Sequence, residues 1–354
     1  MVDVVAEDDF SEDSRLYNHE VTELADTIRE ASGTLYGSSV FDYTAMSPLS
    51  PASLKALNRL RAYNPPPFST WDKLPISRRA AVLLLLFADR RGDLRVVITM
   101  RAASLRNYSG HAAFPGGKAD SLSETPFQIA RREAFEEIGL PHDDSKIPPP
   151  FRIEHICQLP FNLAKTELAV RPCVAFLHCD DPSGSKTVED TMIPRLDAKE
   201  VAAVFSAPFH NFLRAEDEVR PGERIPGKRT DWYHGNWSNW HDGEFRMHYF
   251  YVPIDNQTVT KPKRRDGGQA AIAEHLEEEE ETGMKRYKVW GMTARMLVDA
   301  AKVAYGEEPA FEHMAHLGDE AIITKLYEMN RLPDKKKAGS VLTKEDIEKA
   351  AAKM

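Results

Sequence analysis

Three glutamates within five residues are the part of this sequence best suited to chemistry. Glu133, Glu136 and Glu137 follow Arg132 in the segment R-E-A-F-E-E. Residues three and four positions apart share a helix face, so the carboxylates would project together while Arg132 braces one of them. Their hard oxygens suit Mg²⁺ or Mn²⁺, which keep open positions for water and phosphates. The segment therefore indicates metal-assisted phosphoryl chemistry, and its alternative is a solvated, charged helix face.

A capped helix is expected to carry these carboxylates. Ser123 or Thr125 can cap its start, Pro126 suits the first turn and Gly139 is the expected stop. Apolar residues recur between these limits with helical spacing and would face the core: Phe127, Ala130, Ala134 and Ile138. The carboxylates lie on a different face, so the sequence predicts an amphipathic helix.

Two arginines and a glycine pair precede this helix. Arg101 and Arg106 lie in R-A-A-S-L-R, and Gly116 and Gly117 end the later segment F-P-G-G. Guanidinium groups bind phosphates through paired hydrogen bonds, and glycine lets the backbone approach a pyrophosphate closely. We therefore predict that these residues bind a large anionic substrate. The alternative for each arginine is a structural ion pair.

The glutamate segment resembles the Nudix box, G-x5-E-x7-R-E-U-x-E-E-x-G-U, in which U is a bulky aliphatic residue. The match runs from Glu124 through Arg132 to Leu140. Two departures are present: six residues instead of five separate Gly117 from Glu124, and Ala134 fills an aliphatic position.

The preceding segment is similar to the signature of Nudix coenzyme A diphosphatases, L-L-T-x-R-[SA]-x3-R-x3-G-x3-F-P-G-G. The matching residues are Thr99, Arg101, Ala102, Arg106, Gly110, Phe114, Pro115, Gly116 and Gly117, with Val97 and Ile98 in place of the two leucines. Later segments near 197–208 and 288–301 also resemble members of that family. The resemblance extends in pieces from about residue 80 to residue 303.

This resemblance implies a Nudix α/β/α sandwich with a mixed sheet and hydrolysis of the pyrophosphate of coenzyme A or its derivatives. The expected products are 3′,5′-ADP and 4′-phosphopantetheine or its acyl form. Glu133, Glu136 and Glu137 would hold Mg²⁺ or Mn²⁺, and Arg132 would orient them. A carboxylate outside the helix often completes such sites, and Glu200 is the candidate; its alternative is a solvated helix residue.

Other functions stay open at this point. The same chemistry could act on oxidised nucleotides, dinucleotides or capped RNA, and a non-catalytic Nudix module could bind a nucleotide or a partner. A formal charge of -9 argues against general nucleic-acid binding. The intact carboxylate set argues against a non-catalytic module.

We expect three parts in the chain. Residues 1–76 form a loose and helical N-terminal region, residues 77–305 the catalytic domain, and residues 306–354 a helical tail. Two insertions, 212–243 and 255–285, extend the catalytic domain. The expected strands and helices within these parts are a hairpin at 80–88 and 94–101, strands near 152–159 and 168–178, and helices at 18–32, 50–63 and 288–303.

The first insertion contains D-W-Y-H-G-N-W-S-N-W-H. Its aromatic rings could stack on a base, but packing of an extra loop is the favoured interpretation. His234, His241 and His248 are equally spaced, but the spacing fits no usual zinc motif, so we predict no zinc site.

Several features concern the location of the protein. No apolar run is long enough to span a bilayer, and Cys157, Cys173 and Cys179 lack zinc-ligand spacing and are predicted to be reduced. The final residues Ala352, Lys353 and Met354 resemble a peroxisomal targeting tripeptide. We expect an import receptor to bind it; the alternative is the end of an alanine- and lysine-rich helix.

Overall fold

The structure is a computed structural model. It describes residues 49–101, 111–181, 183, 185–193, 201–219, 223–240, 243–255, 257, 259–261, 286–335 and 342–351. The described residues from Leu49 onward belong to one compact unit.

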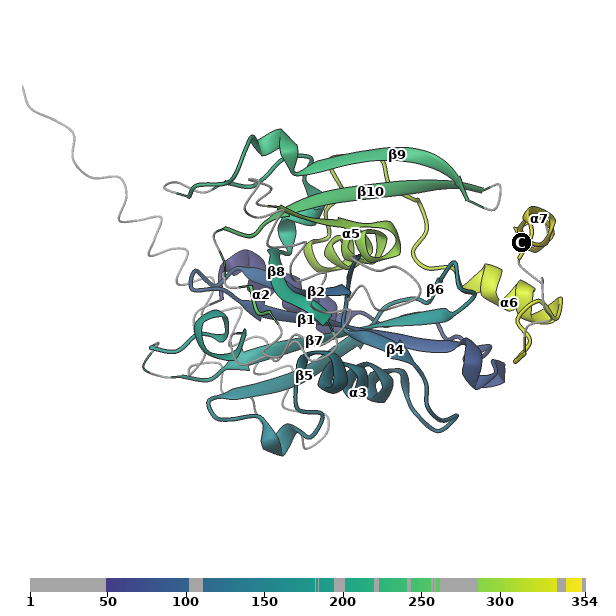
Figure 1. The fold of residues 1–354 in the computed structure, drawn as a ribbon, viewed down its shortest axis with the longest axis horizontal. Coiled ribbons are helices and arrows are strands. Elements are labelled where there is room, and N and C mark those ends of the chain that lie inside the picture. The colour runs from purple at the N-terminus through teal and green to yellow at the C-terminus, as the bar shows by residue number, and fades with distance from the viewer. Residues whose placement is uncertain are drawn as a thin grey trace, which may run out of the picture. The chain divides into compact units, whose positions relative to one another are not determined.

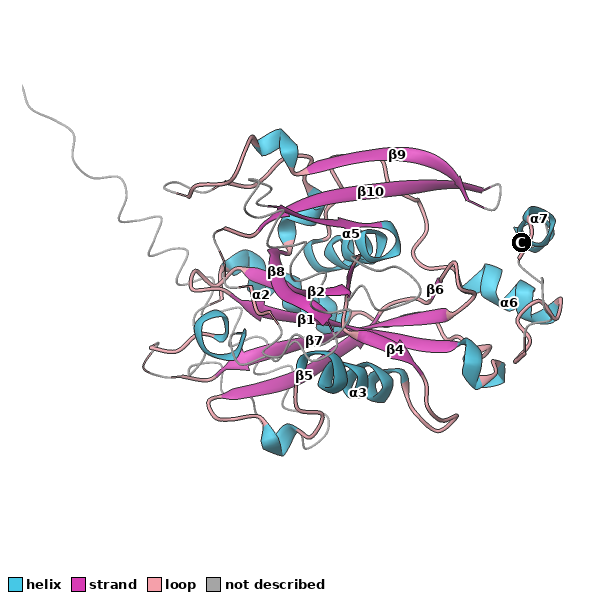
Figure 2. Ribbon diagram, viewed as in Figure 1, coloured by secondary structure: helices cyan, strands magenta, loops and turns pink. Residues whose placement is uncertain are grey.

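A mixed eight-stranded sheet forms the main layer (Figures 1 and 2). Its strands are β1 (Arg79–Ala88), β2 (Leu94–Arg101), β3 (Ala112–Ala113), β4 (Gly116–Lys118), β5 (Phe151–Gln158), β6 (Asn162–Leu163), β7 (Ala169–Cys179) and β8 (Val201–Pro208). The order is β3-β2-β1-β7-β5, with β4 beside β1, β6 beside β7 and β8 beside β2. Strands β1 and β7 run parallel, whereas the other described pairs in this sheet are antiparallel.

Strand β1 is buried on both faces, which explains its nearly continuous run of leucines. Leu83, Leu85 and Phe87 share one hydrophobic cluster with helix α3 (Pro126–Ile138). Leu84 and Leu86 share a second cluster with α2 (Pro51–Ala62) and α5 (Gly291–Tyr305). Helices therefore cover both faces of a mixed sheet, and the predicted α/β/α sandwich is confirmed.

Helix α3 begins and ends where the sequence predicts. The Thr125 hydroxyl accepts a hydrogen bond from the Gln128 N–H at 3.3 Å, while the Gln128 side chain accepts one from the Thr125 N–H at 2.9 Å. Pro126 occupies the first turn, and Gly139 adopts a left-handed conformation with φ of 69°. Ala130, Ala134 and Ile138 are fully buried against the sheet, which leaves the glutamate face of the helix directed elsewhere.

A second, antiparallel sheet lies beyond α5. It consists of β9 (Tyr233–Trp240), β10 (Gly243–Pro253) and β11 (Arg286–Trp290), in the order β11-β10-β9. Figure 1 shows α5 between this sheet and the main sheet. The predicted insertion at 212–243 thus contains an edge strand, and Trp232 packs against Phe212 and Phe250 in the core. For Trp232, the predicted packing of the aromatic residues of this insertion is therefore confirmed.

Two further helices, α6 (Glu320–Glu328) and α7 (Lys344–Ala351), follow α5. Helix α6 contacts β6, and Glu167 joins the tail to the domain because it accepts hydrogen bonds from Arg78 at 2.8 Å and from the Leu342 N–H at 3.3 Å. The domain boundaries at 76 and 305 stay predictions. No helix in the described ranges is long and apolar enough to cross a membrane. Cys157, Cys173 and Cys179 are buried free thiols, as predicted.

Candidate active site

The guanidinium of Arg132 joins two glutamates of α3 and one of the loop that precedes the helix. Its Nε donates to Glu124 Oε1 at 2.9 Å, and its Nη1 donates to Glu133 Oε1 at 3.1 Å and to Glu136 Oε2 at 3.2 Å. Nη2 donates to the carbonyl oxygen of Lys118 in β4 at 2.7 Å. A single side chain therefore ties the carboxylates to the strand that carries the glycine pair.

Glu124 lies in the loop that is one residue longer than the Nudix box pattern. Its Oε2 accepts hydrogen bonds from the backbone N–H groups of Asp120 at 2.6 Å and Ser121 at 3.3 Å. Burial raises the pKa of Glu124, but the hydrogen bonds from Arg132 and from these backbone groups outweigh it, so its pKa lies below the ordinary value. The loop is consequently folded around a charged carboxylate that fixes Arg132.

The glycine pair lies directly against the glutamates. The Gly116 N–H donates to Glu137 Oε2 at 3.1 Å. A Cβ atom at Gly117 would stand 2.3 Å from Glu133 Oε1, and one at Gly116 would stand 2.5 Å from the Ala81 carbonyl oxygen. Glycine at both positions allows β4 to approach α3 and β1 this closely. The predicted contact of these glycines with a pyrophosphate stays a prediction.

Burial differs among the three helix carboxylates. The side chain of Glu136 is 43% exposed and that of Glu133 is 18% exposed, whereas Glu137 is buried. Burial raises the pKa of Glu133 even though Arg132 acts in the opposite direction. A bound cation would favour the ionised form of this carboxyl group.

The donor types fit a hard divalent cation, since the face presents carboxylate oxygens. In the part of the chain that the structure describes, no three Asp, Glu, His or Cys side chains stand close enough together to coordinate one ion. Arg132 Nη1 instead contacts oxygens of Glu133 and Glu136. Metal binding through the other oxygens, Glu133 Oε2 and Glu136 Oε1, is compatible with these contacts and with those of Nε and Nη2 to Glu124 and Lys118.

Several predicted site residues are not described. Arg106 and Glu200 lie outside the described residues, as does the tripeptide Ala352, Lys353 and Met354, and of Arg101 the structure describes only that its backbone ends β2. Their roles stay predictions. The carbonyl group of Lys118 was not predicted as part of the site, because a backbone group carries no signal in the residue type. Glu124 was not predicted as a site residue either, although the box pattern contains that position.

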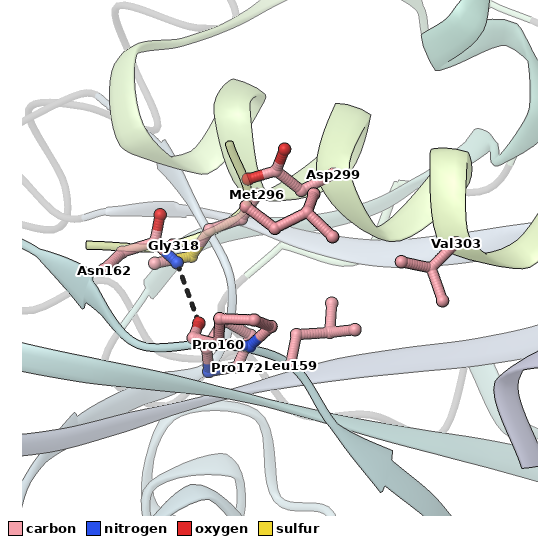
Figure 3. Close-up of a pocket in the computed structure, with 9 residues that line it drawn as sticks. Leu159, Pro160, Asn162, Pro172, Met296, Asp299, Val303 and Gly318 are labelled. Carbon is pink, nitrogen blue, oxygen red and sulfur yellow. Dashed lines mark hydrogen bonds between the residues drawn. The ribbon is translucent and has the colours of Figure 1, made fainter. Parts of the chain in front are cut away.

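A small pocket lies beside α5 (Figure 3). Mostly apolar side chains line it, among them Leu159, Met296 and Val303, together with the carboxylate of Asp299. The Asn162 side chain donates to the Pro160 carbonyl oxygen at 3.2 Å at its edge. Leu159 and Met296 belong to the cluster on the α5 side of the sheet, so this pocket is separate from the α3 carboxylates.

Comparison with known proteins identifies the family. The NUDIX domain profile matches residues 77–266, a range that contains the Arg132 cluster and the glycine pair. The chain belongs to the Nudix family. Peroxisomal coenzyme A diphosphatase 1 of Saccharomyces cerevisiae is 31% identical over 282 residues, which cover 74% of this chain and 79% of the yeast protein. The resemblance to the Nudix box is therefore confirmed, and the protein is a Nudix-type hydrolase.

Two plant relatives are also similar to this Nudix chain. Nudix hydrolase 15, mitochondrial, of Arabidopsis thaliana is 31% identical over 66% of this chain and 61% of its own length. Nudix hydrolase 22, chloroplastic, of the same species is 32% identical over 66% of this chain and 58% of its own length. The chain thus spans less than two thirds of each plant protein. Nudix hydrolases generally use divalent metals, in agreement with the carboxylates on α3.

Proposed function

We propose that this Nudix hydrolase cleaves the pyrophosphate bond of coenzyme A or one of its derivatives. The products would be 3′,5′-ADP and 4′-phosphopantetheine or its acyl form. The observation that carries the proposal is the Arg132 cluster, in which Arg132 contacts Glu124, Glu133 and Glu136 while the neighbouring glycine pair lies against Glu133 and Glu137. The name of the yeast relative and the signature around Arg101 supply the substrate class.

Each residue of the cluster has a proposed task. Glu133, Glu136 and Glu137 would hold Mg²⁺ or Mn²⁺, which supplies a more acidic bound water and neutralises charge on the phosphates. Arg132 keeps the carboxylates in place through its contacts with Glu124 and with β4. The low pKa of Glu124 keeps this anchor charged well below neutral pH.

The remaining tasks rest on the sequence. Arg101 and Arg106 would bind the phosphates of the substrate, Gly116 and Gly117 would let the backbone approach them, and Glu200 would add a carboxylate from outside the helix. We also propose a peroxisomal location, because the yeast relative is named as peroxisomal. A tagged protein with and without residues 352–354 tests this location, and a uniform cytosolic signal of the intact protein would contradict it.

The direct test is a substrate panel. The purified protein is incubated with Mg²⁺ or Mn²⁺ and coenzyme A, acetyl coenzyme A, ADP-ribose, a dinucleotide, an oxidised nucleoside triphosphate and capped RNA, and the products are identified by mass. We expect the highest kcat/KM with a coenzyme A substrate. A higher kcat/KM with another pyrophosphate would contradict coenzyme A as the substrate class. A protein that cleaves none of these substrates would favour a non-catalytic module.

A further inference from the structure

Four aromatic or imidazole rings form a row on one face of the second sheet. His234 of β9 and Trp290 of β11 both face Tyr249 of β10 across the strands. The His234 and Tyr249 rings are 4.5 Å apart and inclined by 15°, and the Tyr249 and Trp290 rings are 6.0 Å apart and inclined by 12°. His111 continues the row, with its ring 4.6 Å from that of Trp290. We call these four residues the ring row.

The ring row lies on the outer face of the sheet. Side chains alternate between the two faces of a strand, and the neighbours Phe250 and Val289 are fully buried in the cluster that includes α5. His234 is exposed, whereas Tyr249, Trp290 and His111 are partly exposed. Rings of this size usually complete a core. The His234, Tyr249 and Trp290 rings are nearly parallel, whereas the His111 ring is inclined by 53° to that of Trp290, and this accessible row is suited to stacking a flat ligand.

A positive charge accompanies the rings. The Lys288 ammonium lies 4.7 Å from the centre of the Tyr249 ring and 5.3 Å from that of Trp290, and its side chain is exposed. A cation held over these rings attracts the anionic group of a ligand whose base stacks on the row. A nucleotide combines these two features, because its purine has two flat faces and its ribose carries phosphate.

The ring row is connected to the candidate active site by a short piece of chain. His111 immediately precedes β3, and six residue steps separate it from Gly117, a distance of at most about 22 Å in extended chain. Hydrogen bonds fix both ends of this piece. The Thr293 hydroxyl of α5 donates to the Ala112 carbonyl oxygen at 3.1 Å, and the Gly116 N–H donates to Glu137 at 3.1 Å.

We propose that the ring row binds the purine of the substrate, with the base stacked at the Trp290 and His111 end and Lys288 beside an anionic ribose phosphate. The proposal deepens the proposed function, because it assumes that the pyrophosphate lies at the α3 carboxylates and belongs to a nucleotide. It identifies residues from three distant parts of the sequence as one base-binding site.

The test measures the affinity of 3′,5′-ADP by calorimetry in the presence of a chelator, with ribose 5-phosphate as the probe that lacks a base. Stacking of one base is worth enough that Trp290→Leu should raise Kd for 3′,5′-ADP roughly tenfold. Trp290→Phe keeps a flat ring and should restore most of the affinity. Ribose 5-phosphate should bind the wild-type protein and Trp290→Leu equally.

Two further variants keep the test decisive if Trp290→Leu does not fold, since Trp290 directly precedes α5. Lys288→Met changes an exposed side chain and should weaken 3′,5′-ADP severalfold through loss of charge. Trp237→Leu is the matched control, because Trp237 is an exposed tryptophan on β9 that faces Arg246 on the opposite face of the same sheet. It should leave the affinity unchanged.

The outcomes separate this inference from the proposed function. Equal affinity of 3′,5′-ADP for the wild-type protein, Trp290→Leu and Lys288→Met would overturn the base site, even if the protein hydrolyses coenzyme A. A wild-type protein that binds 3′,5′-ADP no more tightly than ribose 5-phosphate would also overturn it. Selective loss of 3′,5′-ADP binding in the variants of a protein that does not hydrolyse coenzyme A would support the base site and refute the proposed substrate.

Discussion

Helices α3 and α5 cover opposite faces of the same sheet, and both carry clustered acidic and basic side chains. On α3, Arg132 and Glu136 remain 23% and 43% exposed, respectively, and their partners come from the helix, the preceding loop and a glycine-rich strand. On α5, Arg295 and its partner Asp319 are only 3% and 6% exposed. The α3 charges are accessible to a ligand, whereas the α5 charges are enclosed by protein.

The enclosed charges hold the segment that follows α5. Arg295 binds both oxygens of Asp319 at 3.0 Å, and Asp319 also accepts a hydrogen bond from the Leu163 N–H at 2.9 Å. A second group of enclosed side chains links Asp299, His313 and His248. His313 Nε2 lies 2.7 Å from Asp299 Oδ1, and His313 Nδ1 lies 3.0 Å from His248 Nε2. Burial and the neighbouring His313 lower the pKa of His248 to about 3, so its ring is neutral near pH 7.

Residue types alone do not distinguish an accessible charged cluster from an enclosed one. Both helices present carboxylates next to arginine. The difference is that α3 leaves carboxylate oxygens near solvent beside a glycine pair, whereas α5 pairs its charges within the core. Substitutions on α3 should therefore reduce activity, and substitutions on α5 should reduce stability.

The largest effect is expected from Arg295→Met. This change leaves the Asp319 carboxylate buried without its bidentate partner, and breaking a buried ion pair in this way costs about 3–5 kcal/mol. The free energy of unfolding from urea denaturation measures the loss. The fraction that remains folded should keep its kcat, and a selective loss of kcat at unchanged stability would assign α5 to the chemistry.

Glu136→Gln should produce the opposite result. The change removes a charge from the exposed carboxylate face, and losses of electrostatic site residues typically reduce kcat by about 10²-fold or more. The melting temperature should stay unchanged. Glu345→Gln is the matched control, since Glu345 is an exposed glutamate that pairs with Lys349 one turn away on α7. Wild-type kcat in folded Glu136→Gln would contradict the assignment of the site.

Gly117→Ala tests the close approach of β4 to α3. The added methyl group would stand 2.3 Å from Glu133 Oε1, so the carboxylate must move. A displacement of about 1 Å at a reacting centre can cost up to roughly 10²-fold, and we expect a loss of about tenfold because the carboxylate can rotate in part. The half-saturating Mg²⁺ concentration should also rise. An unchanged metal requirement would indicate that Glu133 does not bind the ion.

A smaller loss of stability than that of Arg295→Met is expected from Arg61→Met, which concerns neither cluster. Arg61 of α2 donates two hydrogen bonds to Glu154 of β5, at 2.9 and 2.8 Å. Burial raises the pKa of Glu154, but Arg61 and His178 outweigh it and lower the pKa from 4.5 to about 2. The native state therefore binds this proton less readily than the unfolded state, so the stabilisation is present above pH 4.5 and is lost as the pH falls towards 2.

Arg61→Met should accordingly lower the free energy of unfolding by roughly 1–3 kcal/mol at pH 7. The difference from the wild-type protein should shrink as the pH falls from 4.5 towards 2, because Glu154 is then protonated in both proteins. Chemical denaturation at several pH values measures this difference. A difference that does not depend on pH would show that Arg61 stabilises α2 by packing alone.

The sequence predicted the elements that depend on neighbouring residues. Two apolar segments separated by the residues D-R-R-G-D at 89–93 predict the β1–β2 hairpin, in which Leu86 pairs with Val96 and Ala88 with Leu94. Ser50 and Thr125 cap α2 and α3 as their positions predict. Such signals are local, because a cap, a turn or a helix face is formed within a few residues.

The second sheet could not be predicted in the same way. Strand β9 contains glycine, asparagine and serine between its aromatic residues, so it reads as a loop. Its partner β10 also pairs with β11, which lies far away in the sequence. Tyr249 is opposite Trp290 at one end of this pairing, and Pro253 is opposite Arg286 at the other. Pairing over such distances depends on the packing of α5 beneath the sheet.

By itself, the sequence determined the carboxylate helix, because helical periodicity puts Glu133, Glu136 and Glu137 on a common side and Pro126 and Gly139 limit the helix. It also identified the Nudix family through the spacing of these residues. Only the tertiary structure decided that Lys118 and Glu124 hold Arg132, and that rings from residues 111, 234, 249 and 290 form one row. Contacts between distant segments depend on strand pairing and core packing, which no local pattern of residues specifies.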